Sequence, residues 1–239
     1  YDLLQNIGKK IDSTLLWVDR SPIGRTPRSN PATYTGLADH IRDLFAKQEQ
    51  SKIAGFSKSR FSFNNKGGRC ETCEGAGKMQ IGMHYMGQVE LLCTACHGKR
   101  FNSATLDVLY RGKNIAEVYE LRISEALGFF SSEKKIMTYL VQMEALGLSY
   151  LTLGQSSTSL SGGEAQRIKL ASALAKKNQK AITFVLEEPT SGLHYQDTKQ
   201  LITALRHINQ LGHTVLCYEH QAQFILAADW IIEPLQDKL

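Results

Sequence analysis

The sequence predicts an α/β fold with a parallel sheet, into which a cysteine-containing hairpin is inserted. From residue 160 onward, the order turn, helix, strand, helix, strand indicates parallel strands joined by crossover helices. Between residues 58 and 102, glycines cluster and two Cys-x-x-Cys pairs flank a run of alternating apolar and polar residues. The chain has 239 residues, 42% of them hydrophobic, which is enough to bury a core of this kind.

The first 50 residues predict a short strand, an irregular stretch and a short helix. The apolar run at residues 15–18 has the length of a strand. Three prolines and one glycine in residues 19–31 exclude a regular helix there. Residues 36–47 place Leu37 and Ile41 on one helical face, so we expect a helix.

The middle of the chain predicts a hairpin followed by helices. A period of two over residues 79–85 indicates a strand, with a turn at Gly87 and a return through residues 89–91. Residues 114–150 carry apolar side chains at helical spacing, and Gly147 is a candidate C-terminal stop. Beyond them we expect helices at 165–177 and 197–211 and strands at 181–186 and 213–218.

Four of the five cysteines have the spacing of a metal site. The pairs are nineteen residues apart, and the N-terminus lacks the pattern of a secretory signal, which favours metal ligation in a reducing compartment over disulfides. Four thiolates fill a tetrahedral zinc site and leave no open position, so the Zn²⁺ should be structural. Free buried thiols and a redox pair are the alternatives. The expected ligands are Cys70, Cys73, Cys93 and Cys96, whereas His84 and His97 are not needed and Cys217 is expected to be a small buried apolar residue.

The basic charge of the chain is concentrated around these cysteines. The chain carries a net charge of +5, and residues 58–100 account for +4 of it. This charge suits contact with a phosphate backbone, although a solvated charged face explains it equally well.

Two further motifs suit nucleotide chemistry. The sequence Leu-Ser-Gly-Gly-Glu at 160–164 opens a helix, whose free N–H groups favour an anion, although such a turn is often only a helix cap. Glu187 and Glu188 follow a buried strand, where one carboxylate can hold Mg²⁺ through water and the other can polarise an attacking water. His220 follows the next strand and could reach a γ-phosphate. The alternative is that these residues are only solvated strand ends. The order and spacing of the Ser-Gly-Gly turn, the glutamate pair and the histidine disfavour it.

These motifs resemble those of a known family. Residues 160–170, LSGGEAQRIKL, resemble the signature motif of ATP-binding cassette (ABC) ATPases. Residues 154–171, 21–36 and 61–77 resemble the C-terminal half of the UvrA family, the damage-recognition ATPases of bacterial nucleotide excision repair. The resemblance covers roughly residues 11–232. It implies part of an ABC-type cassette, with a P-loop NTPase-like sheet and flanking helices, that carries an inserted zinc hairpin with four cysteine ligands.

The resemblance also implies roles and partners. ATP with Mg²⁺ would bind between two cassettes, and Ser161, Gly162 and Gly163 would contact the γ-phosphate held by the other cassette. Glu188 would be the catalytic carboxylate and His220 the switch histidine. The partners would be double-stranded DNA, the missing N-terminal half or a second UvrA-type subunit, and a UvrB-like protein, in the cytoplasm and without a membrane. Our own candidates for DNA contact are Lys66, Arg69, Lys78, Lys99 and Arg100.

The chain departs from the family pattern in ways that bear on activity. It contains no GxxxxGK[ST] phosphate loop, so we expect no ATP hydrolysis by the chain alone. Glu187 stands where the family has the Walker B aspartate, and Arg20 where it has the Q-loop glutamine. The tail at 233–236 lacks the glycine-rich ending of the family. These departures suggest a fragment, a split gene or a diverged paralogue.

Four segments are expected along the chain: residues 1–57 near the Q-loop, a zinc hairpin at 58–102, a helical signature segment at 103–159 and a cassette core at 160–239. One alternative function is a non-catalytic zinc and DNA interaction module. Another is a UvrA-like paralogue in drug resistance. A chaperone-type zinc domain is disfavoured, because residues 70–77 fit its CxxCxGxG repeat but residues 93–100 break it at Arg100.

Overall fold

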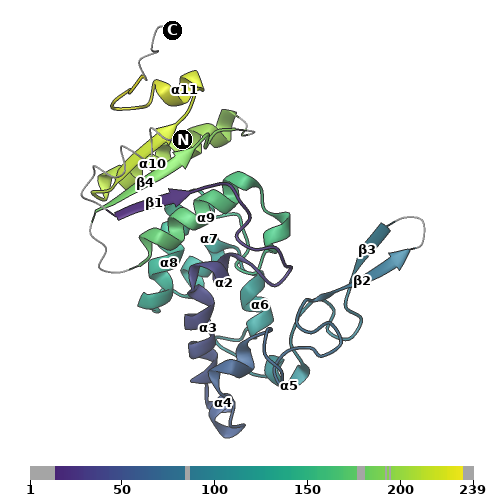
Figure 1. The fold of residues 1–239 in the computed structure, drawn as a ribbon. Coiled ribbons are helices and arrows are strands. Elements are labelled where there is room, and N and C mark those ends of the chain that lie inside the picture. Colours follow the sequence, from purple (N-terminus) through teal and green to yellow (C-terminus); the bar gives the residue numbers. More distant parts are fainter. Residues whose placement is uncertain (1–13, 84–86, 177–180, 192, 194, 234–239) are drawn as a thin grey trace.

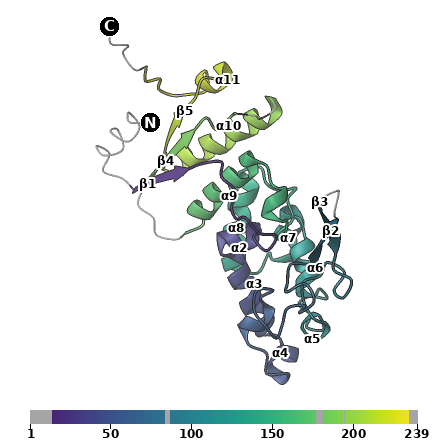
Figure 2. The same cartoon turned by 45° about the vertical axis from the view of Figure 1, so that its right-hand side comes forward.

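A computed structural model describes residues 14–83, 87–176, 181–191, 193 and 195–233 (Figure 1). A small parallel sheet lies at one end of the molecule, a layer of helices lies beneath it, and a two-stranded hairpin projects from the side of the helical layer (Figures 1 and 2). The mixed α/β architecture with a parallel sheet confirms the predicted fold class.

The sheet has the order β1-β4-β5, and its three strands are all parallel. They are β1 (Thr14–Val18), β4 (Ile182–Glu187) and β5 (Thr214–Tyr218), which confirms the three predicted strands. In the ladder Val18 lies opposite Leu186, and Glu187 lies opposite Tyr218. The carboxyl ends of the strands therefore share one edge of the sheet.

The central strand is apolar because both of its faces are covered. Phe184, Val185 and Leu186 of β4 are fully buried, whereas β5 at the edge is half-exposed. Helix α10 (Tyr195–Gln210) joins β4 to β5 and buries Leu201 and Ile208 in the core. Cys217 in β5 is half-buried rather than fully buried, and burial raises the pKa of its thiol to about 12.

Helix α9 (Gly162–Leu174) connects the sheet to the helical layer. It is buried on most sides, and it packs against α2, α8 and β1. The amide of Gln166 donates a hydrogen bond of 3.1 Å to the carbonyl of Val18 at the end of β1. Ser161 caps the helix, as the Ser-Gly-Gly motif predicts, so the helix begins at Gly162, three residues before the start of the apolar pattern at 165.

The helical layer consists of short helices around an apolar core that includes Phe45, Phe130 and Leu140. Gly147 follows the C-cap of α8 with φ of +71°, which confirms the predicted stop. The elements of this layer are α2 (Pro31–Thr35), α3 (Leu37–Ala46), α4 (Glu49–Ile53), α5 (Ser103–Leu106), α6 (Ile115–Glu120), α7 (Ile123–Phe129), α8 (Lys134–Ala145) and the 3-10 turn η2 (Ser157–Ser159). A further short helix, α11 (Ala222–Ile225), follows β5.

The inserted hairpin is also confirmed. Strands β2 (Lys78–Met83) and β3 (Gly87–Leu92) pair antiparallel. Gly87, which we expected at the turn, instead pairs with Met83 as the first residue of β3. His84 lies outside the described residues.

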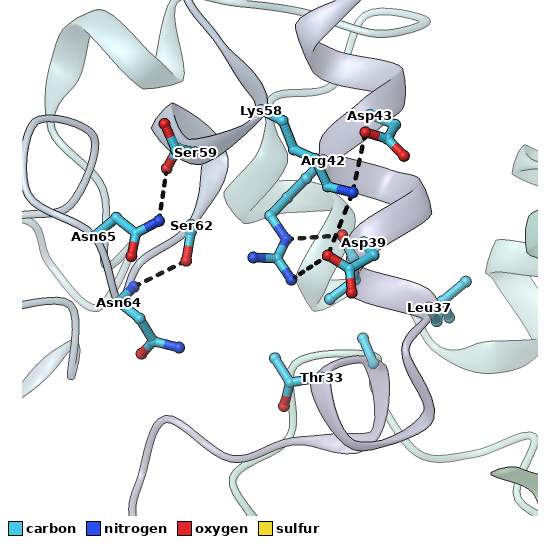
Figure 3. A network of polar contacts seen from close by, with 12 residues as sticks. Thr33, Leu37, Asp39, Arg42, Asp43, Lys58, Ser59, Ser62, Asn64 and Asn65 are labelled. Carbon is cyan, nitrogen blue, oxygen red and sulfur yellow. Dashed lines mark hydrogen bonds and ion pairs between the residues drawn. The ribbon is translucent and has the colours of Figure 1, made fainter.

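A charged cluster attaches the start of the inserted segment to α3 (Figure 3). The ammonium of Lys58, in the 3-10 turn η1 (Lys58–Phe61), lies 3.4 Å from Asp39 and 3.1 Å from Asp43. Arg42 pairs with the same Asp39 at 2.9 Å. These side chains are partly exposed, so their ion pairs add little stability, but they give the segment a defined position on α3.

Residues 1–57 contribute to both the sheet, through β1, and the helical layer, through α2 to α4. The boundaries of the four expected segments stay a prediction. Within the described residues, no helix is both long enough and apolar enough to cross a membrane.

Candidate functional site

The four paired cysteines converge on one point. Their sulfur atoms all lie within 4.8 Å of one another, with Cys70 at 3.9 Å from Cys93 and Cys73 at 3.6 Å from Cys96. Four sulfurs at about 2.3 Å from one zinc ion stand about 3.8 Å apart at tetrahedral angles. The cluster is buried and its cysteines are free rather than disulfide-bonded, so it fits the predicted four-cysteine zinc site.

The two Cys-x-x-Cys turns have matching backbones. Left-handed φ values recur one, two and four residues after the second cysteine of each pair. They are +50° and +48° at the first of these positions, +81° and +85° at the second, and +76° and +70° at the third. One position explains why glycine is needed: a Cβ on Gly75 would lie 1.8 Å from the carbonyl oxygen of Phe63. The matched residues are Glu74 with His97, Gly75 with Gly98, and Gly77 with Arg100.

Backbone N–H groups support the sulfurs. Gly77 donates to the sulfur of Cys73 at 3.2 Å. Burial raises the pKa of the Cys96 thiol to about 12, whereas backbone N–H groups of Cys96 and Ala95 lower that of Cys93 to about 7. Zinc binds thiolates, so metal binding would release protons from these groups.

The predicted nucleotide residues lie at the carboxyl edge of the sheet. Glu188 directly follows β4 with φ of +38°, and its N–H donates to the carbonyl of Tyr218 at 2.8 Å. The imidazole Nδ1 of His220 lies 4.0 Å from the Glu188 carboxylate. The structure therefore brings Glu188 and His220 together, while Glu187 is exposed at the end of β4.

The Ser-Gly-Gly turn forms the N-terminus of α9. The hydroxyl of Ser161 accepts a hydrogen bond from the N–H of Glu164, and the Glu164 carboxylate accepts one from the N–H of Ser161. Gly163 allows a close approach, because a Cβ there would lie 2.8 Å from Leu193. Leu193 donates in turn to the carbonyl of Thr190, so the loop after Glu188 reaches the Ser-Gly-Gly turn.

Comparisons with known proteins match this arrangement, although no family model matches the chain. The chain is 52% identical to UvrABC system protein A of Oceanobacillus iheyensis and 48% identical to that of Bacillus subtilis, in each case over 230 residues and 96% of this chain. The crystal structure of UvrA2 from Deinococcus radiodurans matches with a TM-score of 0.86 and 44% identity, over 95% of this chain and 30% of that one.

The chain belongs to the UvrA family over the segment that it spans. That segment is about a quarter of the length of these curated relatives. The resemblance of the signature, the Ser-Pro-Ile-Gly stretch and the cysteine segment to this family is thereby confirmed.

Arg20, which we expected at the Q-loop position, packs against the Ser-Gly-Gly turn. The guanidinium of Arg20 lies 3.3–3.4 Å from the point where a Cβ of Gly162 would stand. Its neighbours Asp19 and Ser21 hold the ammonium of Lys169, two turns along α9. This hydrogen bond from Lys169 is the largest of the effects that lower the pKa of Asp19. The loop after β1 therefore wraps around the first turns of the signature helix.

The basic residues proposed for DNA contact occupy different environments. Lys66, Lys78 and Lys99 are exposed. Arg69 pairs with Glu71 at 3.2 Å, and Lys78 pairs with Glu90 at 3.1 Å. Arg100 is half-buried, with its guanidinium 5.3 Å from the ring centre of Phe63. Lys66 and Lys99, which are exposed and form no ion pair among the described residues, are the best placed of the five for an outside partner, and the DNA contacts stay a prediction.

Sequence reasoning gave no role to Glu219, whose side chain is only 3% exposed. Its carboxylate accepts hydrogen bonds from the N–H and hydroxyl of Thr190 and from the N–H groups of His220 and Gln221. Burial raises the pKa of this carboxyl, but the hydrogen bonds outweigh burial and hold the pKa below its ordinary value. An acidic residue at a strand end gives no signal of such burial in the sequence.

Proposed function

We propose that this chain supplies part of a UvrA-type ATP-binding cassette that acts on double-stranded DNA in cytoplasmic nucleotide excision repair. The observation that carries the proposal is the arrangement at the carboxyl edge of the sheet. There Glu188 and His220 stand within 4.0 Å of each other, and the adjoining loop contacts the signature turn.

Each residue at this edge has a proposed task. Glu188 would orient and polarise the attacking water, and His220 would donate a hydrogen bond to the γ-phosphate. Glu187 would hold Mg²⁺ through water. Ser161, Gly162 and Gly163 would present N–H groups to the γ-phosphate of an ATP bound by an opposing cassette, beside the cation of Arg20.

The phosphate loop of this site must come from elsewhere, because the 239 residues contain none. The missing N-terminal half or a second UvrA-type subunit would supply it, and a UvrB-like protein would be a further partner. We expect the chain alone to release phosphate from ATP no faster than a buffer blank. Robust turnover that copurifies with the protein through successive columns would overturn this expectation.

A completed cassette tests the catalytic roles. The chain would be joined to the phosphate-loop segment of the Oceanobacillus iheyensis relative, and ATP hydrolysis and ATP binding would be measured separately. Glu188→Gln should lower the hydrolysis rate by about 100-fold or more with ATP affinity retained. Glu144→Gln, an exposed change on α8, is the matched control and should leave both unchanged. Equal rates for the two variants would exclude Glu188 as the catalytic carboxylate.

The zinc site would act in folding rather than in catalysis. Its four thiolates leave no coordination position for water, and the small hairpin has little apolar core of its own. Zn²⁺ held by Cys70, Cys73, Cys93 and Cys96 would fix the base of the hairpin and so present its basic residues to DNA.

DNA contact by the exposed lysines is tested through salt dependence. Lys66→Ala and Lys99→Ala should each weaken binding by a similar factor for all duplex sequences. Each should also reduce the slope of log affinity against log salt by about one. Lys113→Ala, a basic residue outside the hairpin segment, is the control. Unchanged slopes in both hairpin variants would exclude phosphate contact by these two lysines.

A non-catalytic interaction module is the second candidate, favoured by Glu187 and Arg20. A longer carboxylate alters Mg²⁺ geometry, and Arg20 places a fixed cation beside Gly162. In the completed cassette, Arg20→Gln with Glu187→Asp should raise hydrolysis if these two residues limit it. If hydrolysis is absent both before and after the change, the interaction module is the better description.

A further inference from the structure

We infer that Arg100 is a positioning residue that joins the cysteine cluster to the segment leading into the signature turn. The importance of that segment rests on the proposed function, but the link itself rests on contacts at the junction of the hairpin and the helical layer.

The backbone of Arg100 belongs to the cysteine cluster. Its carbonyl accepts a hydrogen bond of 2.9 Å from the N–H of Cys70, and its N–H lies close enough to the sulfur of Cys96 to act on the pKa of that thiol. One residue thus touches both Cys-x-x-Cys pairs, and any shift of the cluster moves it.

The backbone conformation of Arg100 favours a task for its side chain. Its φ is +70°, and the matching position in the first turn is Gly77 with φ of +76°. A glycine would adopt this conformation without strain, whereas a side chain is disfavoured there. Contacts made by the arginine side chain must therefore offset the strain of its backbone.

Those contacts reach the helical layer. The guanidinium lies 5.3 Å from the ring centre of Phe63, and its Nη2 donates to the carbonyl of Gly154 at 3.5 Å, across 54 residues of sequence. The ring of Phe63 packs edge-on against Tyr119 at 5.6 Å. The N–H of Gly154 donates to the carbonyl of Tyr119 at 2.7 Å, so the four residues form a closed set of contacts.

A cleft of about 200 Å³ lies at this junction and is lined by Arg100, Tyr119 and Gly154, among others. The rings of Phe63, Phe101 and Tyr119 form an apolar contact beside this cleft, and the arginine adds a polar link next to it. The exposed ion pair between Arg28 and Glu74, at 3.7 Å, is a weaker link from the same segment.

The segment held by Arg100 leads directly into the signature turn. Ser161 lies seven positions after Gly154, and about halfway along Ser157 donates to the carbonyls of Gly24 and Thr26. Gly154 is bound to the cysteine cluster through Arg100, and Ser157 is bound to the loop after β1. These contacts hold residues 154–161 in a defined conformation. Metal binding to the cysteine cluster would thereby influence how well ordered residues 154–161 are.

Hydrogen exchange on the 239-residue chain tests the inference without nucleotide or DNA, so its result does not depend on the proposed ATPase. In the native chain, removal of the metal with a chelator should increase amide exchange in residues 154–161 at least several-fold. Arg100→Gly should bind zinc as well as the native chain, because glycine adopts the required φ. Exchange in residues 154–161 should nevertheless be raised with zinc bound, and chelation should add little.

Two further variants complete the test. Lys52→Ala removes an exposed cation on α4, away from the junction, and should behave as the native chain. Phe63→Leu removes the aromatic ring beneath the guanidinium and leaves all four cysteines and Arg100 in the chain, and should raise exchange in residues 154–161 with zinc bound. If Arg100→Gly binds zinc and leaves that exchange unchanged, the inference is wrong. If Arg100→Gly loses zinc, the Phe63→Leu variant decides. Unchanged amide exchange in its residues 154–161 overturns the inference, and faster exchange there supports it.

Discussion

The carboxylate of Glu219 connects the two strand ends on which the proposed catalytic residues stand. It holds Thr190, in the loop that follows Glu188, and the N–H of His220. The distance between Glu188 and His220 therefore depends on a residue that has no proposed contact with nucleotide. Such a residue is a positioning group, and its loss should first appear in stability.

The pKa of Glu219 predicts how stability varies with pH. Its pKa in the folded chain lies below 4.5, so its contribution is complete above the unfolded value and is lost as pH falls through the folded value. Glu219→Gln should lower the free energy of unfolding at pH 7 by about 1–3 kcal/mol. As pH falls from 7 through the folded pKa, the difference from the native chain should shrink.

Urea unfolding at several pH values measures this difference. Glu187→Gln, at an exposed site one strand away, is the control and should change stability little. A Glu219→Gln penalty that is the same at every pH would show that the ionised carboxylate is not what the hydrogen bonds stabilise.

At the scale of single residues, the sequence predicts the metal ligands but not the long-range side-chain contacts. The cysteine ligands could be predicted because the spacing itself specifies the chemistry. The positions of Arg20 against Gly162 and of Arg100 against Gly154 could not, because each contact joins residues more than 50 positions apart. Charge counting likewise found the basic residues but not the pairing of Lys78 with Glu90 across the hairpin.

At the scale of elements, local patterns were sufficient where the chain itself sets the geometry. The period of two predicted β2 and β3, and the apolar run at residues 181–186 predicted a central strand. The element boundaries shifted where capping decided them. The apolar periodicity places the start of α9 at residue 165, whereas the Ser-Gly-Gly motif places it at the capping box of Ser161 and Glu164, where the structure has it.

Alanine should affect zinc binding differently at two glycines, one of which lies at the base of the hairpin. Gly75 and Gly112 have similar φ values of +81° and +78°, so alanine should cost about 1 kcal/mol of backbone strain at either. Only at Gly75 would the new Cβ also overlap the Phe63 carbonyl, at 1.8 Å, whereas nothing lies within 4 Å at Gly112. Gly75→Ala should therefore lose zinc affinity by about 10-fold or more, and Gly112→Ala should not.

Competition with a chromophoric chelator measures the zinc affinity of both variants. The comparison separates backbone strain from steric overlap. Alanine is strained at both Gly75 and Gly112, but it overlaps a neighbouring atom at Gly75 alone of the two. Equal affinities in the two variants would mean that the base of the hairpin yields to the added methyl group.

At the scale of the whole molecule, metal removal should act on part of the chain. The cysteine cluster is separate from the main apolar core, which holds the residues of the sheet and α9. A chelator should therefore abolish protection from hydrogen exchange in residues 70–100 and leave β4 protected. Loss of protection throughout the chain would show that the zinc site is needed for the entire fold.

The sheet and the helical layer are joined chiefly through α9, and Gln166 is a specific part of that junction. It is fully buried, and its amide donates to the carbonyl of Val18. Gln166→Leu leaves that carbonyl without its donor, which should lower the free energy of unfolding by about 1–3 kcal/mol. Because the lost contact ties α9 to β1, the sheet should become the less stable part.

Two probes distinguish local from global weakening. In a Trp230→Phe background, Trp17 fluorescence reports on β1, and far-ultraviolet circular dichroism reports mainly on the helices. Gln166→Leu should move the fluorescence transition to lower urea than the dichroism transition, whereas Gln210→Leu, an exposed change at the end of α10, should leave both in place. If both transitions of Gln166→Leu shift together, the sheet and the helical layer unfold as one cooperative unit, and α9 transmits stability between them rather than marking a weak boundary.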